Sequence, residues 1–231
     1  MSQITIYHGS QYIIEKPVFG AGNPRNDYGS GFYCTKDIDL AKEWACTEEK
    51  NGYANIFMLD LSGMKVCNLS GVEYNILNWL ALLLQNRYFR ISNDVAGSAK
   101  SYLISKFLPD VKDADIITGY RADDSYFSFA NSFLNGLLSL EQLETAMYLG
   151  ELGEQTVLKS ENAFRSIKYQ GFQAADRTVY YTLREARDRD ARQAYKKQSS
   201  LQQTLNAVYM LDIMREGWEN DDSRLRRNIS G

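Results

Sequence analysis

The middle of the chain, between about residues 72 and 149, is dominated by apolar side chains at helical spacing, and short β-type segments lie on both sides of it. Ile76, Leu80 and Leu84 recur at steps of four residues, which is the period of a buried helix face. Residues 55–61 are instead rich in apolar, β-branched and aromatic side chains, as strands are. The sequence therefore predicts an α+β protein with a helical insertion and C-terminal helices.

The individual elements follow from the same patterns and from their flanking Gly, Pro and Asn residues. Strands are expected around residue 5 and at 31–35, 55–61, 64–69, 115–119, 155–158 and 165–169. Helices are expected at 37–46, 72–84, 99–108, 125–134, 140–149, 178–198 and 205–218. The glycine-rich stretch 19–31 fits neither pattern and is predicted to be a long loop, a kind of segment that is usually functional.

The chain has 231 residues, of which 44% are hydrophobic and 24% charged. This balance is typical of globular proteins, and it excludes collagen-like, coiled-coil and intrinsically disordered chains. The length fits one compact domain with an extension. We expect a core at residues 1–172 and a C-terminal helical extension, packed on that core, at residues 173–231.

Charge and cysteine content limit the classes of partner. A net charge of −3 argues against a protein held on nucleic acid by bulk charge, although the charged stretch 184–197 is either a solvated helix face or a local basic surface. Three cysteines without CxxC spacing and a single histidine predict neither a disulfide framework nor a metal site. The sequence shows no signal peptide and no apolar run that could span a bilayer, so we expect a cytoplasmic protein without membrane partners.

The first segment that could carry chemistry is Tyr7-His8-Gly9-Ser10, at the end of the first predicted strand. It offers an imidazole, an open backbone and a hydroxyl at one place. The alternative is a turn with a surface histidine. His8 is the only histidine in the chain, which favours the functional interpretation.

The second segment is the glycine-rich loop together with the strand that follows it, Gly31-Phe32-Tyr33-Cys34-Thr35. Glycines beside a short aromatic strand let the backbone approach a ligand closely and let a ring lie flat against it. A glycine-rich hairpin with core aromatics is the alternative. The order of the two segments, followed by a helix with Ala41 and Trp44, is more specific than either segment alone.

With these motifs the sequence resembles the ADP-ribosyltransferase superfamily, in the branch with a His-Tyr-Glu signature that diphtheria-type toxins share with poly(ADP-ribose) polymerases. It is most similar to a bacterial subfamily typified by YHGS, NDYGSGFYCT, DIITGYRADD and a Gln-led strand, motifs that extend from residue 7 to about residue 170. The resemblance implies a split, strongly curved β-sandwich that holds NAD as substrate in a cleft between two sheets, without a metal.

The resemblance also implies roles for single residues. His8 would bind a ribose hydroxyl, Gly9 would bind the nicotinamide carboxamide through its backbone, and Tyr33 would stack on the nicotinamide ring. Ser10 and Thr35 would place hydroxyls near the ribose or the diphosphate. Arg25 is a candidate for the diphosphate on the basis of its charge and its position in the loop.

The sequence departs from the superfamily at the third signature position, which begins a late strand. At that register stands Gln155, and Glu154 is one step away and so on the opposite strand face. Breaking the nicotinamide–ribose bond builds positive charge on the sugar, which a carboxylate stabilises better than an amide. Either a register slip brings Glu154 into the site, or Gln155 works with another carboxylate. Asp123 and Asp124 are the leading candidates, and helix capping is their alternative role.

By resemblance, the expected function is an NAD-dependent mono-ADP-ribosyltransferase, an intracellular bacterial toxin of a toxin–antitoxin or anti-phage system. Its partners would be NAD, a protein or nucleic-acid acceptor and an antitoxin protein. The alternatives are a catalytically inactive NAD- or nucleotide-binding module of the same fold, an NAD glycohydrolase, and a purely structural or interaction domain.

Overall fold

A computed structural model describes residues 3–91, 93–122, 124–148, 153–201 and 207–225. Its strands are β1 (Gln3–Ser10), β2 (Phe32–Thr35), β3 (Gly52–Asp60), β4 (Val66–Asn68), β5 (Ile116–Tyr120), β6 (Glu154–Leu158) and β7 (Ile167–Ala175). Its helices are α1 (Ile38–Ala45), α2 (Ile76–Asn86), α3 (Asp94–Phe107), α4 (Asp124–Leu134), α5 (Leu140–Tyr148), α6 (Glu161–Arg165), α7 (Arg177–Leu201) and α8 (Met210–Arg215). The predicted α+β class is confirmed, and α2 to α5 lie between β4 and β6 in the chain.

The described strands form one mixed sheet in the order β4-β5-β6-β2-β1-β3-β7. Only β4 and β5 are parallel. β1 pairs with β3 along its whole length and β2 pairs with β6 along its whole length, but β1 and β2 share only the pair Tyr7–Thr35. Beyond that pair β1 continues through His8 and β2 through Tyr33, and these two strands form no further pair with each other. The sheet is therefore divided there into two halves, β4-β5-β6-β2 and β1-β3-β7.

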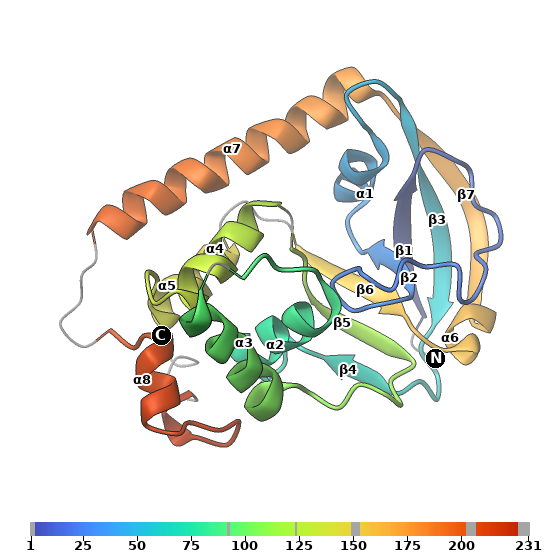
Figure 1. Ribbon diagram of the computed structural model, residues 1–231. Helices are drawn as coiled ribbons and strands as arrows, with labels where there is room; N and C mark the ends of the chain where they lie inside the picture. Colours follow the sequence, from blue (N-terminus) through green and yellow to red (C-terminus); the bar gives the residue numbers. More distant parts are fainter. Residues whose placement is uncertain (1–2, 92, 123, 149–152, 202–206, 226–231) are drawn as a thin grey trace.

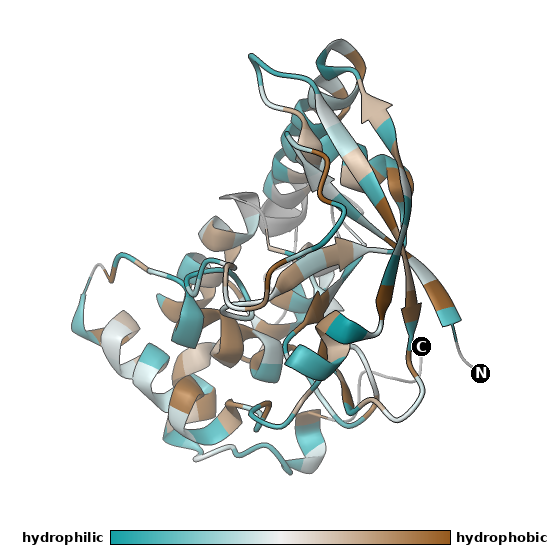
Figure 2. Cartoon of the chain, turned by 90° about the vertical axis from the view of Figure 1, so that its right-hand side faces the viewer, coloured by the Kyte–Doolittle hydropathy of each residue, from teal (hydrophilic) through white to brown (hydrophobic). Residues whose placement is uncertain are grey.

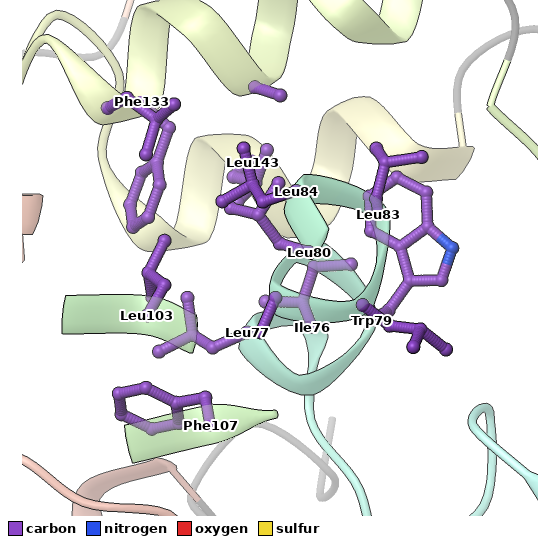
Figure 3. Packing of buried hydrophobic residues seen from close by; sticks show 14 of the residues in the cluster. Ile76, Leu77, Trp79, Leu80, Leu83, Leu84, Leu103, Phe107, Phe133 and Leu143 are labelled. Atoms are coloured by element: carbon purple, nitrogen blue, oxygen red, sulfur yellow. The ribbon is translucent and has the colours of Figure 1, made fainter. Parts of the chain in front are cut away.

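Helices cover the β4-β5-β6-β2 half of the sheet. Figure 1 shows α2 to α5 and α8 gathered on that side of the molecule. α2 is their centre, since every residue from Ile76 to Leu84 is buried. A helix that is apolar all round must be enclosed by other elements, and Figure 3 shows its side chains meeting Leu103 and Phe107 of α3 and Leu143 of α5. The Asn75 side chain caps its first turn.

A second, smaller core combines Phe32 of β2 with Ile6 and Phe57 of the β1-β3-β7 half of the sheet. In Figure 2 the paired strands of this half carry brown hydrophobic segments between teal hydrophilic ones, as strands with one buried face do. Helix α1 packs on β1 so closely that a Cβ added at Gly9 would lie 2.0 Å from the Ala41 carbonyl oxygen. Gly9 is thus required for the contact between α1 and the sheet.

The C-terminal elements differ in part from the sequence prediction. β7 continues to Ala175, past the expected boundary at residue 172. The long charged helix is confirmed as α7, which Figure 1 shows running from the end of β7 towards the helical side. The last helix is shorter than predicted at both ends: it begins after its N-cap residue, Tyr209, and it ends before Gly217, which adopts a positive φ of 66°. Its residues Met210 and Ile213 are buried in the larger core.

Two further features concern what the described residues contain. The short helix α6, capped by the Ser160 side chain, was not predicted, because five residues are too few for a helical period to be visible. No helix in the described residues is both long and apolar enough to cross a membrane.

Candidate active site

A pocket of about 400 Å³ lies where the sheet divides. His8 lines it from β1, and Phe32 and Tyr33 line it from β2. The remaining wall comes from the loop between these strands and from α6, and consists of Ile14, Lys16, Pro17, Val18, Ala21, Gly22, Asn26, Gly31 and Phe164. A second pocket of about 710 Å³ adjoins it and shares Lys16, Pro17, Val18 and Phe164. The two halves of the sheet and the loop that joins them therefore meet around these two adjoining pockets.

His8 bridges the gap between the two strands. Its Nδ1 lies 2.7 Å from the backbone oxygen of Tyr33, and its ring stacks on Phe32 with centroids 4.2 Å apart. Burial lowers the pKa of His8, with the bond to Tyr33 opposing the shift, so the ring is neutral at pH 7. Because a carbonyl can only accept, Nδ1 carries the proton. The other ring nitrogen, Nε2, is then an acceptor suited to a ligand hydroxyl.

The ring of Tyr33 is held in place by its hydroxyl group. That hydroxyl accepts from the backbone N–H of Tyr28 at 2.9 Å and donates to the carbonyl of Gly29 at 2.6 Å. Burial raises the pKa of Tyr33, so the phenol stays protonated and keeps its donor. The loop is fastened a second time by Lys159, whose ammonium donates to the carbonyls of Tyr28 and Ser30. Tyr33 therefore presents a fixed ring at the pocket.

Gln155 is the first buried residue of β6, and Glu154, one step earlier, is exposed. Gln155 is the cross-strand neighbour of Thr35 in β2. Its Nε2 donates to Asp27 Oδ2 and to the backbone oxygen of Tyr120, each at 3.1 Å. The strand alternation expected from the sequence thus separates the two candidates, with the amide turned inward and the carboxylate outward.

The carboxylate that contacts Gln155 is Asp27, a residue that the sequence reasoning did not single out. Asp27 is only 5% exposed, and its Oδ2 also accepts from the backbone N–H of Ala122 at 3.1 Å. Arg87 Nε lies 3.6 Å from its Oδ1. Burial raises the pKa of Asp27, while the hydrogen bonds from Ala122 and Gln155 and the charge of Arg87 oppose that shift. In the sequence, Asp27 looked like an ordinary turn residue of a glycine-rich loop.

A family model for proteins of unknown function, DUF3990, matches residues 4–169. This chain belongs to the DUF3990 family. No curated protein and no solved structure matches it. The DUF3990 segment contains His8, Asp27, Tyr33 and Gln155, and it ends inside β7, before α7 and α8. The two residues that line the cavity, His8 and Tyr33, and the bonded pair Asp27 and Gln155 therefore lie in the part of the chain that the family shares.

Other predicted residues of the DUF3990 segment lie around the cavity without lining it. Thr35 is buried, and its hydroxyl accepts from the backbone N–H of Asp37, the residue that caps α1. The Ser10 hydroxyl accepts from the backbone N–H of Tyr12 in an exposed turn. Arg25 is exposed in the loop. The structure thus gives Thr35 and Ser10 local backbone roles.

The side chains of the two candidate aspartates, at the start of α4, lie outside the described part of the chain. Asp123 lies outside the described residues, and Asp124 begins α4, with its side chain outside them as well. A larger groove of about 1070 Å³ lies between α3 and α8, lined in part by Ile91, Tyr102 and Met214. It contains none of the predicted site residues, so the cavity at the divided sheet is the better candidate site.

A second feature missed by the sequence reasoning is a stacked pair near the start of β6. The guanidinium of Arg121, the residue after β5, lies 3.7 Å from the ring centroid of Trp44 on α1. Trp44 Nε1 is buried and has no hydrogen-bond partner in the described part of the chain. Buried donors are almost always paired, so an unpaired indole N–H indicates a group that a ligand could satisfy.

Proposed function

We propose that this DUF3990 protein is an NAD-dependent mono-ADP-ribosyltransferase whose divided sheet is a split, curved β-sandwich of that superfamily. The observation that carries the proposal is the strand order β6-β2-β1. It makes neighbours of the three strands with Gln155, Tyr33 and His8, which are the positions of the superfamily signature. Two of these residues, His8 and Tyr33, line one cavity.

The chemistry of the cavity fits a dinucleotide with two rings and a diphosphate. His8 offers an acceptor for a ribose hydroxyl, and the rings of Phe32 and Tyr33 offer apolar faces. The Lys16 ammonium belongs to both adjoining pockets, where it can meet a diphosphate. NAD is the substrate that the resemblance implies.

In the proposed reaction the bond between the nicotinamide nitrogen and ribose C1′ breaks, and its electron pair leaves with nicotinamide. The acceptor's nucleophilic atom then forms a bond to C1′ and gives up its proton to solvent. Positive charge builds on the ribose between these events, so a site with negative potential stabilises the transition state. Gln155 supplies an amide oxygen, and the Asp27 carboxylate lies directly behind it.

The cellular role that the resemblance implies is that of a cytoplasmic bacterial toxin with an antitoxin partner and a protein or nucleic-acid acceptor. Two alternatives have an observation in their favour, the neutral amide at position 155. A site with a weaker electrostatic contribution could bind NAD or another nucleotide without turnover, or could transfer ADP-ribose only to water, as a glycohydrolase does.

One set of assays separates these functions. Pure protein is mixed with NAD, alone and together with cell extract; binding is measured by calorimetry, and nicotinamide and free ADP-ribose are measured by chromatography. Release of nicotinamide together with ADP-ribose attached to cellular protein or RNA indicates a transferase. Release of nicotinamide with an equal amount of free ADP-ribose indicates a glycohydrolase. Binding of NAD without release of nicotinamide indicates an inactive module. Absence of both binding and nicotinamide release would refute the proposal.

The site assignment is tested in the same experiment. His8→Ala should weaken NAD binding by about 1–2 kcal/mol, because one hydrogen bond and one ring contact are lost. Ser101→Ala is the control, since Ser101 is exposed on α3 and its hydroxyl bonds only the backbone of its own helix. Equal NAD affinity in wild type and His8→Ala would exclude this cavity as the binding site.

A further inference from the structure

The orientation of the Gln155 amide is fixed by the chemistry of its neighbours. Both of its hydrogen bonds use Nε2, and both partners, the Asp27 carboxylate and the Tyr120 carbonyl, can only accept. A flipped amide would place its oxygen against two acceptors. A glutamate here would have no proton to donate. The surroundings of position 155 therefore require an amide, and in a single orientation.

The two acceptors are themselves held rigidly. The Tyr120 carbonyl also accepts from the Tyr28 hydroxyl at 2.6 Å and from Trp79 Nε1 at 3.0 Å. Asp27 is anchored by the Ala122 N–H and faces Arg87. These groups come from the glycine-rich loop, β5, α2 and the segment before α4. Hydrogen bonds that share acceptors in such a network fix each member more firmly than isolated bonds do.

We propose that Asp27 is a positioning residue of this site, which orients the Gln155 amide and polarises it. A carboxylate that accepts from the amide N–H draws negative charge towards the amide oxygen, because hydrogen bonds in a chain reinforce one another. Gln155 Oε1, which takes part in neither bond, thereby becomes a stronger acceptor. The negative charge that a glutamate would carry is supplied by Asp27, one hydrogen bond further back. This inference rests on the proposed transferase function.

Comparing Asp27→Ala with Asp27→Asn tests whether activity depends on the hydrogen bond that orients the Gln155 amide. In the wild type one oxygen, Oδ2, accepts from both Ala122 and Gln155. An asparagine can keep both bonds through Oδ1, because the flipped amide would place Nδ2 against two donors. We expect Asp27→Ala to lower kcat for nicotinamide release at least tenfold, with KM for NAD changed less than threefold. Asp27→Asn should retain at least three times the kcat of Asp27→Ala.

Asn78→Ala is the matched structural control. Asn78 is buried in α2, and its side-chain amide bonds Phe107 and Asn220, away from the cavity. The Asn78→Ala variant should lose stability, as Asp27→Ala does, but its kcat per folded molecule should equal that of the wild type. Equal kcat in wild type and Asp27→Ala, or equal losses in Asp27→Ala and Asp27→Asn, would overturn the positioning role.

A second measurement needs no NAD and so remains informative if the proposed function fails. The side-chain amide protons of Gln155 are assigned by NMR, by comparison with Gln155→Ala, and their exchange with solvent is measured. We expect strong protection in the wild type and in Asp27→Asn, and at least tenfold faster exchange in Asp27→Ala. Wild-type exchange as fast as in exposed glutamines would refute the orientation. An ordered Gln155 without nicotinamide release or NAD binding would refute the transferase alone.

Discussion

Replacing Gln155 by glutamate tests the hydrogen-bond arrangement at the start of β6 most directly. The substitution keeps the side-chain shape but replaces an Nε2 donor, 3.1 Å from Asp27 Oδ2, by an oxygen. Two carboxylates at that distance repel by about 5 kcal/mol at an effective dielectric constant of 20. The pair avoids most of this repulsion by keeping a proton, as coupled carboxylates do.

Retaining the proton has a free-energy cost that sets the expected loss of stability. A glutamic acid with an ordinary pKa of about 4.3 costs about 3.7 kcal/mol to keep protonated at pH 7. The regained O–H bond to Asp27 offsets about 1 kcal/mol of this. We therefore expect Gln155→Glu to lower the free energy of unfolding by about 2–4 kcal/mol at pH 7. A more active enzyme is not expected, because the new group is held neutral.

The pH dependence distinguishes this mechanism from a general packing defect. A carboxyl group whose pKa is raised in the folded state binds more protons there than in the unfolded state, so stability falls as the pH rises above the unfolded pKa. Urea unfolding of Gln155→Glu should show little loss at pH 4 and the full loss at pH 7, relative to wild type. Gln155→Met, which adds no charge, should show a smaller pH slope. Wild-type stability at pH 7 together with raised activity would refute the arrangement.

Three further perturbations test Asp27 and two contacts of helix α1. Because burial raises the pKa of Asp27, the stability of the wild type relative to Asp27→Asn should fall as the pH rises above about 4; parallel pH profiles in urea unfolding would contradict this. Gly9→Ala should cost about 3 kcal/mol in thermal unfolding, since its Cβ would overlap the Ala41 carbonyl, and a tolerated alanine would disprove the close approach. Arg187→Ala removes the ion-pair partner, 3.0 Å away, of Glu43, whose side chain is only 3% exposed. This should lower the free energy of unfolding by about 3 kcal/mol and make α7 more sensitive to proteolysis. Unchanged cleavage would show that this pair does not hold α7 on α1.

Local patterns in the sequence were sufficient for most of the fold. Apolar residues at steps of four between Ile76 and Leu84 predicted a helix with a buried face, and the structure has a helix there that is buried throughout this stretch. Asp37 was expected to begin a helix, and its side chain caps α1 by accepting from Asp39 and Leu40. These elements were predictable because the residues that determine them lie within one or two turns of each other.

The site was predictable only in part, because its decisive contacts join residues far apart in the chain. Asp27 and Gln155 are 128 positions apart, and no spacing rule connects them. In the sequence, Gln155 was interpreted as a departure from a carboxylate signature. In the structure, an amide is the group that Asp27 and the Tyr120 carbonyl require. The division of the sheet after the Tyr7–Thr35 pair could not be predicted from local patterns either, since strand order is a tertiary property.

The glycine-rich loop is the element that unites these features. It lines the cavity and leads into β2, and it is fixed just before β2 by the Tyr33 hydroxyl and by Lys159. Because these contacts fix Tyr28 and the residues after it, they also hold Asp27, the residue before Tyr28, where it accepts from the Gln155 amide. One segment therefore forms a wall of the cavity and also sets the electrostatics of the strand beside it. A change that loosens the loop, such as Tyr33→Phe, should consequently affect both ligand affinity and the orientation of the Gln155 amide, whereas a change in Gln155 alone should leave ligand affinity largely intact.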